Sequence, residues 1–229
     1  MDGIKDILEL TFPGKIGAGG SAVGNSCPVQ ILSGEFSLSD PDACDSCVGK
    51  HPGVVSCSKE ILKFKSCSTV HVLEFDKYVK SFNRNFHQCC DYIAYDTSED
   101  KSKIAFCELT CSNTEHVEPY SSADGKNNIG KRAKAFGQIR DTLETLLTLN
   151  VLDQNILTYP SKIGIFGWRE RKANDGYEDA AVESMAEFSD TPSSEEPVLY
   201  TKDFILQHDF IFIQVKYPYV FQWNQILNN

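Results

Sequence analysis

Hydrophobic and polar residues follow two different periods along the chain. Residues 90–110, CDYIAYDTSEDKSKIAFCELT, hold two apolar runs around a short charged turn, which predicts a β-hairpin. In residues 129–150 the apolar positions recur every three or four residues, which predicts one amphipathic helix; these positions are Phe136, Ile139, Leu143, Leu146 and Leu147. KIGIFGW, residues 162–168, then predicts a strand. This order of elements predicts an α/β (α+β) fold with the helix across one face of a sheet.

The first part of the chain is less regular. Residues 1–59 are dense in Gly, Ser, Pro and Asp, which predicts loops and turns. We expect short strands there at DILELTF, residues 6–12, and PVQILS, residues 28–33. Farther along, SKEILKF (58–64) and FDKYVKSFN (75–83) predict short helical turns, separated by the β-branched TVHVLEF.

The last part of the chain divides into an acidic and an apolar segment. Residues 173–197 hold eight acids and no Lys or Arg, which predicts a loop with a short helix over EDAAVESMAEF. DFIFIQVKYPYVFQW predicts one or two strands broken near Pro218, because proline cannot donate to a sheet ladder. We therefore expect one domain with four parts: an irregular N-terminal part (1–59), a core (60–170), the acidic loop (173–197) and C-terminal strands (198–229).

The apolar runs, the first residues and the cysteines of the chain bear on its cellular compartment. No apolar run approaches the roughly 20 residues that span a bilayer. The first residues include acids and lack a basic segment followed by an apolar one, so we expect no secretory signal. We expect a cytoplasmic protein with no membrane partner. Its nine cysteines, an odd number, are then expected to be reduced thiols.

The formal net charge of −10 is unevenly distributed. Without the eight acids of residues 173–197, 24 acids remain against 22 bases, so the rest of the chain is close to neutral. Two short segments carry the cations that are candidates to touch a nucleic-acid backbone: Lys131, Arg132, Lys134, Arg140, Arg169, Arg171 and Lys172. A solvated surface is the other interpretation of these runs.

The N-terminal part carries a CxxC. Cys44 and Cys47 form CDSC, with His51 and Cys57 close behind. Zinc takes four N or S ligands, and a CxxC supplies two of them from one turn. The sequence has neither a second CxxC nor an HxxxH, so we favour a turn-rich loop over a zinc site at Cys44 and Cys47.

Two carboxylates lie in the otherwise apolar hairpin. Asp91 opens its first strand, and Glu108 lies in its second. Because successive side chains of a strand point to opposite faces, Glu108 and Thr110 share one face and Cys107 takes the other. The two acids are candidates to converge on one metal ion.

The pieces CDYIAYD, AFCELT and KRAKAFGQIRDTLETL resemble the PD-(D/E)xK nuclease superfamily, over roughly residues 60–170. The resemblance implies a restriction-endonuclease-like mixed central sheet flanked by helices. It implies that Asp91 and Glu108 bind Mg²⁺ against the scissile phosphate and that Gln138 orients substrate or water. It also implies bacterial anti-phage defence as the setting, with nucleic acid as substrate and a protein complex as the assembly.

The sequence departs from the family pattern at one position. The family has a lysine two residues after the second acid, where this chain has Thr110. A hydroxyl positions water but does not stabilise developing negative charge as a cation does. In the superfamily this lysine sometimes moves to the neighbouring helix, so Lys131 and Lys134 are the candidates. They share a strip of the helix with Gln138, a strip we expect nearly opposite the apolar stripe.

Three functions stay open from the sequence. The first is a metal-dependent nuclease, or a relative that kept the fold and lost catalysis. The second is a non-catalytic subunit whose acidic segment and aromatic C-terminal strands bind a protein partner. The third is a small zinc-stabilised binding module around Cys44 and Cys47. Two unrelated surface acids would also produce the pattern at Asp91 and Glu108.

Overall fold

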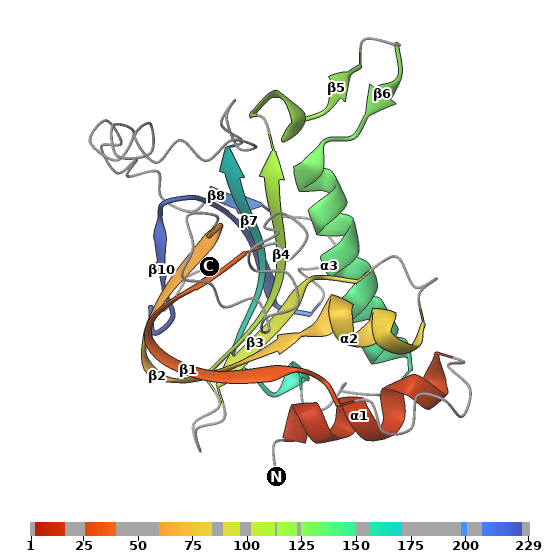
Figure 1. Ribbon diagram of the computed structural model, residues 1–229, viewed down its shortest axis with the longest axis vertical. Coiled ribbons are helices and arrows are strands. Elements are labelled where there is room, and N and C mark those ends of the chain that lie inside the picture. Colours follow the sequence, from red (N-terminus) through yellow and green to blue (C-terminus); the bar gives the residue numbers. More distant parts are fainter. Residues whose placement is uncertain are drawn as a thin grey trace.

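The computed structural model describes residues 3–16, 26–39, 60–83, 89–96, 102–112, 114–122, 125–149, 156–170, 198–200 and 208–225. These residues form three α-helices, one twisted eight-stranded sheet and a separate two-stranded hairpin (Figure 1). Parallel and antiparallel pairs occur in the same sheet. The predicted mixed α/β (α+β) fold is therefore confirmed.

The first half of the sheet is an antiparallel meander. β1 (Val29–Leu38) pairs with β2 (Leu62–Glu74), β2 with β3 (Tyr92–Asp96), and β3 with β4 (Lys103–Ser112). The hairpin predicted in residues 90–110 is therefore confirmed, although its first strand starts at Tyr92 and not at Asp91.

The second half of the sheet is mainly parallel. α3 (Lys131–Thr148) follows β4 and leads to β7 (Ser161–Glu170), which lies beside β4 in parallel orientation. β9 (Phe210–Lys216) is parallel to β7, and the edge strand β8 (Val198–Tyr200) is antiparallel to β9. The strand predicted at KIGIFGW is therefore part of β7.

The long strand β2 has different neighbours along its length. Residues 63–65 pair with β10 (Val220–Gln222), and residues 70–74 pair with β3. Because β10 follows β9, this pairing bends the sheet back on itself (Figure 1). The curled sheet encloses an inner core with Phe64, Phe221 and Trp223 at its centre. The predicted break near Pro218 is confirmed, since it separates β9 from β10.

The three helices cover the outer face of the sheet. α1 (Gly3–Lys15), α2 (Phe75–Phe82) and α3 enclose an outer core with β3, β4, β7 and β9. α3 packs into it through Phe136, Ile139 and Leu143, as the spacing predicts. The helix predicted over residues 129–150 thus begins and ends two residues inside those limits.

Two short-range predictions are wrong. DILELTF is helical and belongs to α1, whose Ile4, Leu8 and Phe12 are buried at intervals of four. SKEILKF leads into β2, where Leu62 and Phe64 are buried on the same face. In both segments a short apolar run fitted two periods, and packing against the sheet decided between them. β1 also makes the N-terminal part more regular than its composition predicts.

The remaining predictions are either confirmed or lie outside the described residues. FDKYVKSFN is confirmed as α2, and PVQILS lies in β1. The segment after β4 contains a short 3₁₀ turn, η3 (Thr114–His116), and the hairpin of β5 (Tyr120–Ser121) and β6 (Asn127–Asn128). The acidic loop, its helix and the CDSC site lie outside the described residues. Within the described residues, no helix is long and apolar enough to cross a membrane.

Candidate functional site

The register of the β3–β4 hairpin brings the two predicted acids together. Tyr92 lies opposite Cys107, and the antiparallel register continues to Tyr95 opposite Ile104. One residue before Tyr92, the same register places Asp91 opposite Glu108. Residues directly opposite on antiparallel strands have side chains about 5 Å apart at Cβ.

The outer face of β4 carries Glu108 and Thr110. Cys107, Leu109 and Cys111 pack into or against the inner core, so the alternating residues of the strand point to the other side, where α3 lies. Glu108 and Thr110 are both half-buried. The predicted placement of Cys107 on the opposite, buried face is confirmed.

Asp91 is fixed by hydrogen bonds at both its side chain and its backbone. Its Oδ2 accepts a hydrogen bond from the Leu109 amide at 2.8 Å. Its carbonyl oxygen accepts from the amides of Phe75 and Asp76 at 2.8 and 3.3 Å, in the first turn of α2. The Asp91 carboxylate is therefore held by β4 and its backbone by α2, one residue before β3 begins.

The negative charges of the two acids act on the same thiol. Burial raises the pKa of Cys107, and the charges of Asp91 and Glu108 raise it further. Glu108 also contributes to the raised pKa values of Cys89 and Cys90, in which burial is the largest cause. These thiols stay protonated at neutral pH and lack the thiolate that a nucleophile needs.

Gln138 and Thr142 connect α3 to the segment that leads into β3. Gln138 Nε2 donates to the carbonyl oxygen of Cys89 at 3.4 Å. Thr142 Oγ1 accepts from the Cys90 amide at 2.8 Å and donates to the Gln138 carbonyl at 2.8 Å. Gln138 is therefore half-buried beside the acid-bearing segment, and the expectation that its strip lies nearly opposite the apolar stripe is wrong. The strip flanks the buried face of α3.

The two lysines of that strip lie farther out. Lys134 is exposed and Lys131 is half-buried. Neither forms an ion pair within the part of the chain that the structure describes. Two neighbouring cations of α3 do: Arg132 bonds to Glu118, and Arg140 bonds to Asp141 at 2.6 Å.

A different lysine lies in the same row of the sheet as Thr110. The parallel register places Thr110 beside Trp168, and Trp168 beside Lys216. Lys216 Nζ lies 5.2 Å from the centre of the Trp168 ring, on the outer face of the sheet. The sequence alone does not place Lys216 near Thr110, because neither segment by itself shows that β7 pairs with β9.

A metal ion at this place would have two carboxylate ligands from the protein. The described residues contain no group of three or more His, Cys, Asp or Glu side chains that could hold a metal ion. A nearby third acid, Asp76, pairs with Lys80 at 2.6 Å and accepts from Cys89 Sγ at 3.2 Å. Mg²⁺ usually keeps several waters and takes one or two carboxylates plus substrate phosphates, so Asp91 and Glu108 fit it.

Comparison with known proteins identifies no relative of this chain. No protein-family model matches the chain, and no curated protein or solved structure matches it.

Proposed function

We propose that this protein is a Mg²⁺-dependent nuclease of the restriction-endonuclease-like kind, with Asp91 and Glu108 as its metal ligands. The observation that supports the proposal is the register of β3 on β4, which, continued by one residue beyond Tyr92, places Asp91 opposite Glu108. Like charges placed directly opposite each other destabilise a hairpin. A bound cation would remove this repulsion.

Each residue around the pair has a defined part in this proposal. Asp91 and Glu108 would hold the ion, which when bound would polarise a phosphate oxygen and lower the pKa of a water. Thr110 shares the face of Glu108 and positions a water through its hydroxyl. Gln138 donates to the Cys89 carbonyl and so orients the segment that carries Asp91. By the family resemblance, the substrate is foreign DNA and the protein works within a defence complex.

A second candidate is a relative that keeps the fold and the metal but does not cleave. Thr110 favours it, because this residue gives the site no cation at the position where the family has one. Lys131 and Lys134 are the proposed substitutes on α3. The exposure of Lys134 supports this role less well than the half-buried position of Lys131.

The deciding experiment is a titration of the purified protein with Mg²⁺ or Mn²⁺ during incubation with single-stranded DNA, duplex DNA and RNA. We expect cleavage of at least one substrate, dependent on the metal and abolished by EDTA. Calorimetry on the same samples measures metal binding. Metal binding without cleavage would select the second candidate, and the absence of both would overturn the proposal.

A further inference from the structure

Three cations from distant parts of the sequence gather where β7 and β9 end. Lys63 comes from the start of β2, Arg169 from the end of β7 and Lys216 from the end of β9. Two aromatic rings hold them. Lys63 Nζ and Arg169 Cζ lie 5.0 and 4.7 Å from the centre of the Tyr217 ring, and Lys216 Nζ lies 5.2 Å from that of Trp168. Rings attract cations at such distances.

Hydrogen bonds fix this cluster in place. The Tyr217 amide donates to the Trp168 carbonyl at 2.9 Å, which joins the backbone after β9 to the end of β7. Tyr217 Oη donates to Glu60 Oε1 at 3.0 Å, and Lys63 Nζ pairs with the same carboxylate at 2.7 Å. Arg169 Nη1 donates to the Glu60 carbonyl at 3.4 Å. The cations are therefore ordered before any ligand arrives, which lowers the entropic cost of binding.

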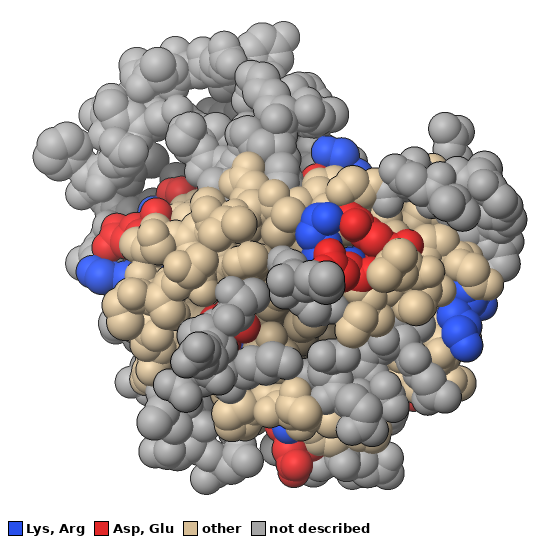
Figure 2. All heavy atoms as spheres, turned by 90° about the horizontal axis from the view of Figure 1, so that it is seen from below, with Lys and Arg blue, Asp and Glu red and all other residues tan. Residues whose placement is uncertain are grey.

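The positive charge of this cluster exceeds the negative charge beside it. Burial raises the pKa of Glu60, but the bonds from Lys63 and Ser37 lower it more, so the carboxyl is ionised. Glu60 is shared by Lys63 and Tyr217, and the neighbouring acid Glu170 accepts from Thr114 Oγ1 at 2.6 Å. Among the described residues, the three cations have Glu60 and Glu170 as neighbouring acids, while Glu35 of the adjoining groove pairs with Lys65 at 3.1 Å. By contrast, on the face of Figure 2, which looks at the lower end of Figure 1, basic and acidic side chains lie next to each other.

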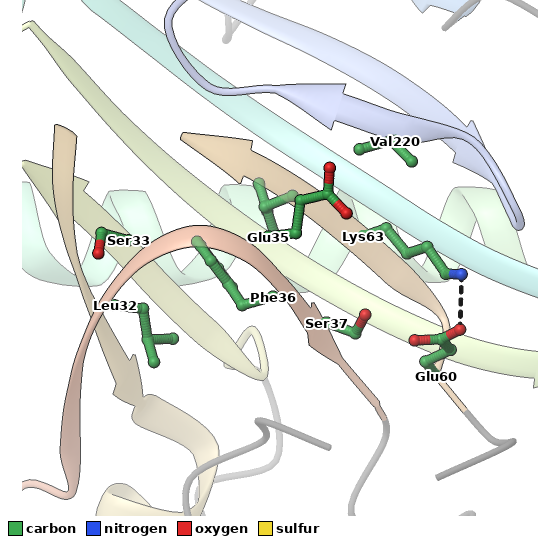
Figure 3. A pocket seen from close by; sticks show the side chains of 9 residues that line it. Leu32, Ser33, Glu35, Phe36, Ser37, Glu60, Lys63 and Val220 are labelled. Carbon is green, nitrogen blue, oxygen red and sulfur yellow. Dashed lines mark ion pairs between the residues drawn. The ribbon is translucent and has the colours of Figure 1, made fainter. Parts of the chain in front are cut away.

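Solvent reaches the cluster from the side of β1. A groove of about 390 Å³ runs between β1, β2 and β10, and the Glu60–Lys63 pair lies on its border (Figure 3). The Lys63 side chain keeps 29% of its surface exposed despite its ion pair. Arg169, Lys216 and Tyr217 are also half-buried and not enclosed. A polyanion can therefore contact these cations without rearrangement of the sheet.

One member of the cluster, Lys216, lies in line with the candidate metal site, whereas Arg169 and Tyr217 follow Trp168 and Lys216 directly and so point to the other face at the same end of the sheet. Lys216 and Trp168 continue the row of Thr110, two residues beyond Glu108. Neighbouring strands are about 4.8 Å apart, so Lys216 lies about 10 Å across the sheet from Thr110. Since successive phosphates of one strand advance about 3.4 Å along a duplex, a backbone contact at Lys216 is within a few nucleotides of Thr110. The carboxyl ends of parallel strands are also where open α/β sheets bind ligands.

We propose that Lys63, Arg169 and Lys216, held on the rings of Tyr217 and Trp168, form a phosphate-binding edge that receives the backbone of a nucleic-acid strand. Its use as the approach to Asp91 and Glu108 rests on the proposed function, whereas binding itself does not. Two cations predicted from the sequence, Arg171 and Lys172, follow β7 but lie outside the described residues.

The test measures binding without cleavage. The affinity for a fluorescent single-stranded 20-mer and its duplex is determined in Ca²⁺ at several salt concentrations, for the wild type, K63Q, R169Q, K216Q and the triple variant. K15Q, an exposed lysine of α1, is the matched control. We expect each single change to weaken binding about threefold to tenfold, and the triple variant about 100-fold. Each lost contact reduces the slope of log K against log salt by about 0.7 to 0.9.

The conservative pair R169K and K216R separates charge from packing. Both should retain most of the affinity. Circular dichroism checks that every variant is folded. If the triple variant is unfolded, the single variants alone test the phosphate-binding edge. The proposed edge would be refuted if R169Q and K216Q bind with wild-type affinity, or if K15Q loses as much affinity as they do. If the edge variants bind normally while D91N stops cleavage, the nuclease proposal stands and the edge fails. If they lose binding but the wild type never cleaves, the edge stands and the nuclease proposal fails.

Discussion

An aspartate lies at each end of β3, Asp96 as its last residue and Asp91 directly before its first, in different surroundings. Asp96, at the end of the strand, is surrounded by donors: its carboxylate accepts from the Ser102 amide at 2.8 Å, from the Ser102 hydroxyl and from Trp223 Nε1 at 3.4 Å. Asp91, at the start, accepts from the Leu109 amide and lies opposite a second carboxylate, Glu108. One acid is matched by donors and the other is placed against a like charge.

On the proposed function, this difference separates a structural acid from a metal ligand. Donors around Asp96 join the β3–β4 turn to the C-terminal segment, where Lys103 Nζ also donates to the carbonyl oxygens of Trp223 and, at 2.8 Å, Gln225. Such a network stabilises the fold whether or not a ligand is present. On the proposed function, a bound cation would relieve the repulsion between Asp91 and Glu108. The following changes test whether the two ends differ in this way.

The largest expected effect is on cleavage. D91N keeps an oxygen for the Leu109 amide, and E108Q keeps the size of the side chain, but each removes a charge from the metal site. We expect the cleavage rate to fall roughly 100-fold or more in each variant, because charge stabilisation of the transition state is lost. Thermal unfolding without metal should stay level or shift upward. E144Q, an exposed acid of α3, is the control. A variant that cleaves normally would make Asp91 equivalent to a surface acid.

At the other end of β3, the expected effect is on stability. D96N replaces a buried carboxylate, which accepts several hydrogen bonds, by a neutral amide. We expect the free energy of unfolding to fall by about 1–3 kcal/mol. Urea denaturation measures this change, and Mg²⁺ affinity measured by calorimetry should remain that of the wild type. Loss of Mg²⁺ binding in a folded D96N protein would erase the distinction between the two ends.

A smaller effect is expected when the family lysine is restored. Thr110 is half-buried on the face of Glu108, so T110K places an ammonium group close to the proposed metal site. In an active enzyme with a relocated cation we expect about a tenfold change in rate, the equivalent of roughly 1.4 kcal/mol. In a protein that binds metal but does not cleave, the same change should create measurable cleavage. T110V is the control for packing, and no change in either protein would count against the site.

The smallest effect concerns the pH dependence of the structural end. Burial lowers the pKa of Lys103 from 10.5 to about 8, although the charge of Asp96 opposes the change. Between these two values the unfolded chain binds more protons than the folded one, so the free energy of unfolding should rise as the pH rises from about 8 to about 10.5. Below pH 8 the lysine is charged in both states and its contribution is constant.

K103M isolates this contribution, because it removes the titrating amine and keeps a long apolar side chain. Urea denaturation at pH 7.5, 9 and 10 should show the rise in the wild type and a flatter profile in K103M, since tyrosines and thiols titrate equally in both. Identical profiles would mean that the carbonyl acceptors of Lys103 keep its pKa near the ordinary value.

Local periodicity determined the elements that are long or clearly patterned. The three-to-four spacing of Phe136, Ile139 and Leu143 predicted α3, and the alternation around Glu108 predicted which face of β4 is buried. These patterns follow from the fixed geometry of the helix and the strand, so they are visible in one segment alone. The strand predicted at DILELTF is wrong because the apolar spacing of these seven residues is compatible with a strand as well as a helix.

Only the tertiary structure decided which distant residues meet. The register of β3 on β4 placed Asp91 opposite Glu108, and the register of β7 on β9 placed Lys216 beside Trp168. The return of β10 to β2 brought Tyr217 to Lys63, which lies more than 150 positions earlier in the chain. The choice among such pairings depends on how whole faces pack in the two cores, and a shift of one residue would turn every side chain to the other face. No single segment carries that information.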